Sequence, residues 1–334
     1  MRNRLTVIGA FLLLYIVLVN LSAYLLFFLI NTAYDLCVAN GLTGGAELIG
    51  YYTQGGGFIL YVLALNAITQ YLIGMPVAAY FMKKFLSAEP AEEGSRVSVA
   101  DAVMIVPIVF FLMIAGSVLG SLTAGILGNL TGENFTNSTV EMLVSGTLPV
   151  TILFVVIIAP IAEELFFRRL LIDLVRPIGR RGAVMLSGVC FALFHQNLFQ
   201  FFYTLFLGIV LALIYEKTRR IRYTILIHIL VNFVGGLILP WSAEVLETLD
   251  PDALAAGILP PEILPALLFF AAFFLLVIVG MVLTVIWIAR GRMRLEERPE
   301  TPSYRDFRRA FITSPGMLLY MIVCIGFAVF NLFG

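Results

Sequence analysis

The chain has 334 residues, of which 61% are apolar and 13% are charged, and its 21 basic and 21 acidic residues give a formal net charge of zero. Soluble domains are about 45–50% apolar and about 25% charged, so this chain has too little polar surface to cover a globule in water. A soluble enzyme is therefore excluded. Nucleic-acid binding is excluded as well, because it needs a net basic face.

Long apolar runs predict an all-α, polytopic integral membrane protein. A helix needs about 20 mainly apolar residues to cross a hydrocarbon layer of about 30 Å. By that measure the chain has about nine candidate transmembrane helices, near residues 5–30, 58–82, 103–127, 148–167, 183–198, 201–215, 223–239, 264–289 and 316–333. The fifth and sixth are short and flank a polar run, His195 to Gln200, which predicts a tight hairpin or irregular segments shielded by neighbouring helices.

The basic residues predict the orientation of the chain. If the N-terminus is cytoplasmic and the spans alternate, all 21 Lys and Arg residues fall on the inner side, and the outer loops 31–57, 128–147 and 240–263 contain none. The positive-inside rule therefore predicts a cytoplasmic N-terminus and an outer C-terminus. We expect the protein in a prokaryotic plasma membrane, or in the endoplasmic reticulum if the host is eukaryotic.

Ionisable and amide side chains inside the spans are concentrated between residues 160 and 232. Such groups are costly in a bilayer and by default mark a functional site. The chain has only two histidines, and both fall in this region. The candidate residues are Glu163, Glu164, Arg168, His195, His228 and Asn232.

The spacing of these residues predicts how they pair. Glu164 and Arg168 are four residues apart on one helix, with the acid first, which favours an ion pair and leaves Glu163 as the spare carboxylate. His228 and Asn232 are also four residues apart, so their side chains project from one face.

Phe191 and His195 repeat this spacing, which lets the phenyl ring wall one side of the imidazole. If the fourth helix continues to about Val175 and the fifth begins near Gly182, Glu163 and His195 lie at the same depth and can face each other.

Three runs resemble the signature motifs of one protein family. They are Glu163-Glu164-Leu-Phe-Phe-Arg168, Phe191-Ala-Leu-Phe-His195 and His228-Ile-Leu-Val-Asn232. In this order they match the EExxxR, FxxxH and HxxxN motifs of the CPBP intramembrane endopeptidases, also called the CAAX protease and bacteriocin-processing (Abi) family, which includes the Ras-converting CAAX prenyl endopeptidase. The resemblance covers about residues 148–240, which we predict to be the protease core with helices 4–7. Residues 1–147 then hold helices 1–3 with outer loops, and residues 241–334 hold an outer loop and helices 8–9.

The resemblance implies an intramembrane endopeptidase that cleaves a membrane-anchored peptide or protein near the cytoplasmic face of the bilayer. The substrate would be a prenylated CAAX-type peptide or a bacteriocin or leader peptide. In this family pattern Glu163 activates a water that His195 holds, and His228 with Asn232 stabilises the oxyanion. Glu164, Arg168 and Phe191 would support the site structurally.

Three alternatives remain at this point. Glu163, His195 and His228 have the composition of a catalytic zinc site, but the His-Glu-x-x-His helix of zinc proteases is absent and Asn232 is a poor zinc ligand, so we expect no metal or other cofactor. The same three residues could serve an ion- or proton-coupled transporter as a relay, although no repeat halves are visible. A non-catalytic immunity or scaffold protein of the same fold is the third, and the intact motifs argue against it.

Overall fold

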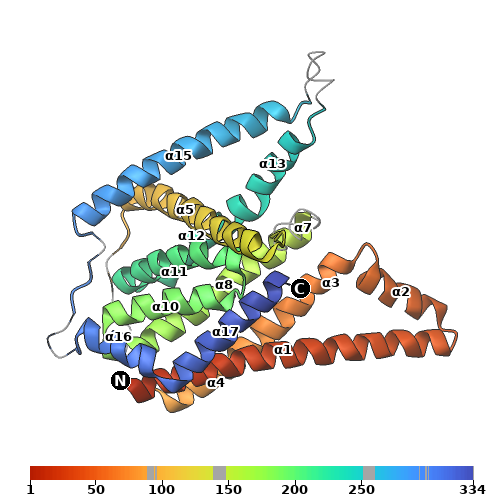
Figure 1. The fold of residues 1–334 in the computed structure, drawn as a ribbon, viewed down its shortest axis with the longest axis horizontal. Coiled ribbons are helices and arrows are strands. Elements are labelled where there is room, and N and C mark those ends of the chain that lie inside the picture. Colours follow the sequence, from red (N-terminus) through yellow and green to blue (C-terminus); the bar gives the residue numbers. More distant parts are fainter. Residues whose placement is uncertain are drawn as a thin grey trace.

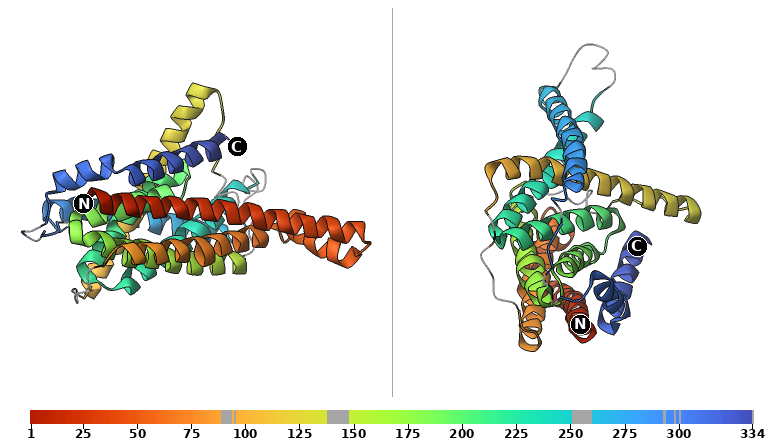
Figure 2. Two further views of the ribbon diagram at one scale, coloured as in Figure 1. Left: turned by 90° about the horizontal axis from the view of Figure 1, so that it is seen from below. Right: turned by 90° about the vertical axis from the view of Figure 1, so that its left-hand side faces the viewer.

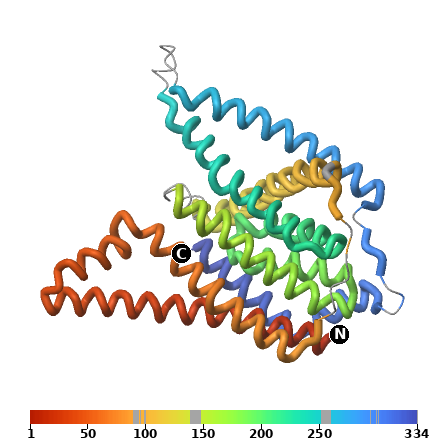
Figure 3. The backbone as a smooth tube through the Cα atoms, turned by 180° about the vertical axis from the view of Figure 1, so that it is seen from behind, coloured from red at the N-terminus to blue at the C-terminus, as the bar shows by residue number. Residues whose placement is uncertain are grey.

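The computed structural model describes residues 1–88, 94, 96–137, 148–250, 260–292, 294–297, 299 and 301–333. Within these residues the regular structure is helical and contains no strand, which confirms the predicted all-α class. The long helices lie alongside one another in a bundle (Figure 1). Residues 148–238, which contain the motif residues, occupy its centre (Figure 3).

Several helices are continuous but change between α and π geometry along their length. The first spans are α1 (Arg2–Ala39), then α3, η1 and α4 (Phe58–Ala67, Ile68–Gly74 and Met75–Phe85), then α5 (Val99–Thr131). The motif-bearing helix, which we call the carboxylate helix, consists of α7, η2, α8, η3, α9 and η4 (Leu148–Thr151, Ile152–Ile158, Ala159–Glu164, Leu165–Ile172, Asp173–Val175 and Arg176–Ile178). It is followed by α10 (Arg180–Phe194), α11 (Leu198–Thr218), and α12, η5 and α13 (Ile221–Phe233, Val234–Ile238 and Leu239–Glu247). The chain ends with α15 (Ile263–Ala289), α16 (Tyr304–Thr313) and α17 (Pro315–Phe333).

Ion pairs join the helix ends at one end of the bundle. Glu216 accepts hydrogen bonds from Arg176 at 2.9 Å and from Arg180 at 2.6 Å, and Asp173 accepts one from Arg219 at 2.6 Å. These contacts tie the end of the carboxylate helix and the start of α10 to the end of α11. We call this side of the bundle the basic end.

Other helices reach the basic end as well. Arg292, which follows α15, lies 3.7 Å from Asp101 at the start of α5 and accepts a hydrogen bond from Lys217 through its carbonyl. Arg4 of α1 donates to the carbonyl of Ser87, just beyond α4. The described part of the chain thus brings basic residues from distant segments together, as the sequence predicted. Arg298 lies outside the described residues.

The two termini lie at opposite ends of the bundle. Ser314 contacts Thr6 through their hydroxyls at 3.1 Å, so α17 starts beside the start of α1. At its other end, Asn331 donates to the carbonyl of Gln196 at 3.1 Å, which is the turn between α10 and α11. The membrane face on which each terminus lies stays a prediction.

The predicted number of spans needs a correction. Among the described residues, eight helices are long and apolar enough to cross a membrane, where about nine were expected. The difference is α10, whose 15 residues reach only about 22 Å. It forms a tight hairpin with α11, in which the Cα of Gly188 lies 3.0 Å from the position that a Cβ on Gly208 would take. The hairpin alternative for this region is therefore confirmed.

The predicted first outer loop is largely helical. The helix α1 has 38 residues, about 57 Å, and continues well past the expected end at residue 30. The helix α2 (Thr43–Gln54) then folds back along it. The far half of α1 and α2 extend beyond the remaining helices (Figures 1 and 2). Their side chains are largely exposed, for example Tyr24 with 73%.

A glycine contact holds α17 against α1. A Cβ on Gly316 would lie 2.1 Å from the carbonyl oxygen of Thr6, and a Cβ on Gly9 would lie 2.3 Å from the backbone of Gly316. Small residues of this kind let membrane helices approach closely where lipid offers no hydrophobic driving force.

Replacing Gly316 by alanine is expected to lower the thermal stability of the detergent-solubilised protein, because the new methyl group has to push the helices apart. Overpacking of this kind costs about 1–3 kcal/mol. Gly326→Ala on the same helix is the matched control, since a Cβ there has no neighbour within 4 Å. A melting temperature that falls equally in both variants would contradict the close contact.

Candidate active site

The two glutamates lie in a short α-helical stretch between two π-helical segments. Glu163 and Glu164 end α8, with η2 before them and η3 after them. Their exposed fractions are 5% and 0%. Segments of π-helix are frequent at functional sites. The carboxylate helix continues beyond Val175, the residue near which the sequence placed its end, to Ile178. Glu163 and His195 lie equal numbers of residues before and after Gly179.

The predicted ion pair between Glu164 and Arg168 is confirmed. Arg168 Nε lies 3.2 Å from Glu164 Oε2, and both side chains are fully buried. The guanidinium group also lies over the ring of Phe191, with Cζ 4.3 Å from the ring centre. Its Nη1 and Nη2 atoms make no hydrogen bond among the described residues, so Glu164 and the aromatic face are its main compensation.

Glu163 has different partners from Glu164. The hydroxyl of Tyr71 donates to Glu163 Oε1 at 3.0 Å, and Glu163 Oε2 lies 3.8 Å from His228 Nε2. The other nitrogen of that ring, Nδ1, lies 3.0 Å from Glu164 Oε1. Because an ionised carboxylate only accepts hydrogen bonds, Nδ1 carries the proton and donates a hydrogen bond to Glu164. His228 therefore connects the two carboxylates.

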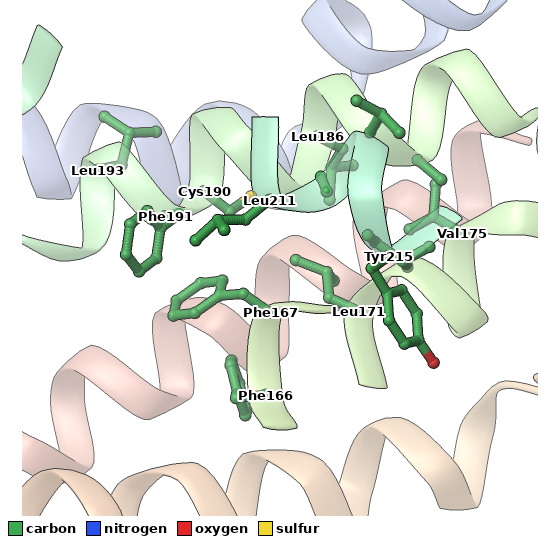
Figure 4. Close-up of a cluster of buried hydrophobic side chains, with 14 of the residues drawn as sticks. Phe166, Phe167, Leu171, Val175, Leu186, Cys190, Phe191, Leu193, Leu211 and Tyr215 are labelled. Atoms are coloured by element: carbon green, nitrogen blue, oxygen red, sulfur yellow. The ribbon is translucent and has the colours of Figure 1, made fainter. Parts of the chain in front are cut away.

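His195 is fixed by the helix that it ends. Its Nδ1 donates to the carbonyl of Phe191 at 2.8 Å, which leaves Nε2 with a free lone pair in the neutral ring. The Phe191 ring contacts both imidazoles edge-on, with centroid distances of 4.8 Å to His195 and 5.6 Å to His228. Below it lie Phe167 and Phe166, which anchor the ring in the core (Figure 4). Phe191 thus supports both histidines as well as Arg168.

Asn232 is held by a carbonyl that a proline leaves available. In the π register of η2, the N–H of Ala159 bonds to the carbonyl of Phe154, so the next carbonyl, that of Val155, would need the N–H of residue 160. That residue is Pro160, which has no N–H. Asn232 Nδ2 donates to the Val155 carbonyl instead, at 2.9 Å. One N–H of the Asn232 amide remains for another acceptor.

One cavity of about 410 Å³ brings together the four residues for which the family pattern implies catalytic roles. Its lining includes Glu163, His195, His228 and Asn232. These side chains come from α8, the end of α10, and α12. Glu164 and Arg168 do not belong to the described lining, which agrees with a supporting position.

The cavity extends away from the basic end. Beyond Glu163 its walls come from the half of each helix that is farther from the basic end, as shown by Asn66, Gln70, Ser117 and Gln200. The sequence predicted cleavage near the cytoplasmic face, and the membrane side of the site stays a prediction. Relative to the basic end, the cavity lies on the opposite side of Glu163. The physical reason is that the basic end is closed by its ion pairs and by fully buried aliphatic side chains, namely Leu171, Ile172, Leu174 and Val175.

Sequence reasoning missed Tyr71 and Gln200. Tyr71 lies in an apolar span 92 residues before Glu163, and nothing in its local pattern distinguishes it from other tyrosines in spans. Gln200 belonged to the polar run that was predicted as a turn, but its place in the cavity follows from the packing of α11.

Three side chains of the cavity carry atoms that can bind a metal, namely Glu163, His195 and His228. In the part of the chain that the structure describes, no group of three His, Cys, Asp or Glu side chains is arranged to hold a metal ion. Both histidines direct Nδ1 to other partners, the carbonyl of Phe191 and the carboxylate of Glu164. Histidine metal ligands make the same kind of contact through their other ring nitrogen, so the metal-free chemistry stays a prediction.

Comparison with known proteins places the motif region in a family. Residues 145–234 match the family of Type II CAAX prenyl endopeptidase Rce1-like proteins. The chain is also 31% identical over 132 residues to the membrane-embedded CAAX protease MroQ of Staphylococcus aureus (strain USA300), an alignment that covers 37% of this chain and 50% of the relative. The chain thus spans about half the length of the curated relative that it matches. No solved structure matches the chain.

These matches support the CPBP, or CAAX protease, family for the motif region, and the resemblance found in the three motifs is confirmed there. Together with the apolar helices, the bacterial relative also identifies an integral membrane protein.

Proposed function

We propose that this protein is an intramembrane endopeptidase of the glutamate type that hydrolyses a membrane-associated peptide. The observation that carries the proposal is the position of Glu163. It is a buried carboxylate that no arginine neutralises within the described residues, and it borders a cavity that His195, His228 and Asn232 also line. A carboxylate in this setting can accept a proton from water beside a bound peptide.

In the first step, a water molecule in the cavity donates one hydrogen bond to Glu163 and one to the free Nε2 of His195. Glu163 takes a proton from this water, and the water oxygen forms a bond to the carbonyl carbon of the scissile peptide. The hydrogen bond from Tyr71 fixes Glu163 Oε1, so that Oε2 is the oxygen available for the proton.

In the second step, the oxyanion of the tetrahedral intermediate accepts a hydrogen bond from the remaining N–H of the Asn232 amide. His228 donates a second hydrogen bond through Nε2 when both ring nitrogens carry protons. One oxyanion donor contributes about 10²–10³-fold to kcat. Glu163 then returns its proton to the leaving nitrogen as the C–N bond breaks, which restores the carboxylate and releases an amine and a carboxylic acid.

The substrate class follows from the setting of the site. Because the cavity lies between membrane-spanning helices, the substrate is a membrane-anchored peptide, of prenylated CAAX type or a leader or bacteriocin peptide. The relative MroQ is described as a CAAX protease. A bacterial relative supports the plasma membrane of a prokaryote as the location of this chain.

Cleavage of a membrane-peptide library by the purified protein in detergent tests the proposal. We expect defined cleavage products from the parent and none from Glu163→Ala. Absence of cleavage by the parent, together with Glu163-dependent ion flux in sealed vesicles, would contradict the protease and support transport.

Removal of metal ions is expected to leave the activity unchanged. The mechanism needs only the four side chains of the cavity, so cleavage in a tight chelator should proceed at the rate seen without it. The measurement is the initial rate before and after chelation, followed by addition of zinc. Loss of activity that zinc restores would overturn the metal-free mechanism.

A further inference from the structure

The cavity beyond Glu163 has an uncharged lining of apolar side chains with some amides and hydroxyls among them. Among the described residues that form its walls there is no Lys, Arg or Asp, and apart from tyrosine hydroxyls the ionisable groups are the proposed catalytic Glu163, His195 and His228. The other polar groups are amides and hydroxyls, for example those of Gln200 and Ser117. A ligand in this cavity therefore finds hydrogen-bonding partners but no permanent counter-charge outside the catalytic residues.

Gln200 contributes an amide to the cavity from the start of α11. It lies on the first turn of α11 and is 8% exposed. Its backbone N–H donates a hydrogen bond to the side-chain oxygen of Asn197 at 3.3 Å. Its backbone carbonyl accepts a hydrogen bond from the hydroxyl of Thr204 at 2.8 Å. Its side-chain amide lines the cavity and makes no hydrogen bond to another described residue. The amide therefore borders the cavity with its hydrogen-bonding groups available to a ligand or to water.

The chemistry of the amide matches a peptide main chain. A primary amide offers both a carbonyl acceptor and N–H donors, which are complementary to the N–H and C=O groups of an extended peptide. Gln200 on α11 and Asn232 on α12 approach the same cavity from different helices. One can hold the main chain while the other contacts the scissile carbonyl.

We propose that Gln200 binds the main chain of the substrate and that the cavity selects an uncharged peptide segment around the scissile bond. This inference rests on the proposed protease function and names its substrate class. A charged side chain in the cavity would lose its hydration without meeting a fixed counter-charge beyond the catalytic groups. Uncharged residues avoid this cost, and the peptide reaches them through the part of the cavity that faces away from the basic end.

Gln200→Met is the first test, because methionine has a similar size but cannot replace the amide hydrogen bonds. We expect KM to rise about 3- to 10-fold, the effect of one lost hydrogen bond, with kcat and the melting temperature close to those of the parent. Gln54→Leu, an exposed glutamine on α2 outside the cavity lining, is the control and should change neither constant.

Substrate variants provide the second test. Replacing a neutral residue next to the scissile bond by lysine should lower kcat/KM by about 10- to 100-fold, whereas methionine at that position should be tolerated. A peptide in which an ester replaces the main-chain amide bound by Gln200 should have a higher KM with the parent. With Gln200→Met the ester should cause no further loss, because the partner is already absent.

An unchanged KM in Gln200→Met, or equal cleavage of the lysine and methionine peptides, would overturn this inference. The proposed function would then stand on its own, provided that Glu163→Gln still abolishes cleavage in the same assay. If the parent cleaves no peptide, the failure lies in the proposed function.

Discussion

Replacement of Glu163 by glutamine is expected to lower kcat for peptide cleavage by about 10²–10⁴-fold, the usual contribution of a general base. Glutamine has nearly the same shape and its carbonyl oxygen can still accept the hydrogen bond from Tyr71, which donates to Glu163 in the parent. It cannot accept a proton from water at neutral pH. The site would therefore remain folded but lose the step that generates the nucleophile.

The measurement is kcat and KM on one cleaved peptide, with the melting temperature in detergent as a test of folding. We expect KM and the melting temperature to stay near the parent values. Glu47→Gln, which changes an exposed carboxylate on α2, is the matched control and should be fully active. Parent-like kcat in Glu163→Gln would rule out Glu163 as the general base.

Replacement of Arg168 by leucine is expected to lower the stability of the protein by about 3–5 kcal/mol, the cost of removing one partner from a buried ion pair. Glu164 and Arg168 are both fully buried, so the remaining carboxylate has no solvent to compensate its charge. The guanidinium also lies against Phe191, which contacts both histidines. We therefore expect activity to fall together with stability.

A second variant separates the charge from the loss of packing. In the double variant Glu164→Leu, Arg168→Leu no buried charge remains uncompensated from this pair, so the melting temperature should recover part of the loss seen in Arg168→Leu. Arg308→Leu removes an exposed arginine from α16 and serves as a control with little effect. If Arg168→Leu melts like the parent, the ion pair does not stabilise the fold.

Contacts between side chains of one helix could be predicted from the sequence, because they depend on the fixed geometry of the helix. The pairing of Glu164 with Arg168 follows from their spacing of four residues, and the structure confirms it. The same periodicity placed Glu163 and His195 at corresponding distances from the Gly179 turn once the carboxylate helix was extended beyond the apolar run.

Contacts between side chains of different helices could not be predicted in the same way. The sequence assigned Glu164 one partner, but the structure adds His228, which lies 3.0 Å away and comes from another helix. Tyr71 reaches Glu163 across 92 residues of sequence. The fifth predicted span is α10, which ends after 15 residues at a polar turn and is shorter than the eight described helices that are long enough to cross a membrane.

The sequence by itself determined that this is a helical membrane protein, which residues are candidates for its chemistry, and which family it resembles, because composition, hydropathy and helical spacing are local properties. The tertiary structure alone decided the side on which the cavity lies. The basic residues mark one end of the bundle, yet ion pairs and aliphatic packing close that end, and space remains on the other side of Glu163. Where helices leave space depends on how side chains from distant segments fill the gaps between them, and no single segment encodes that.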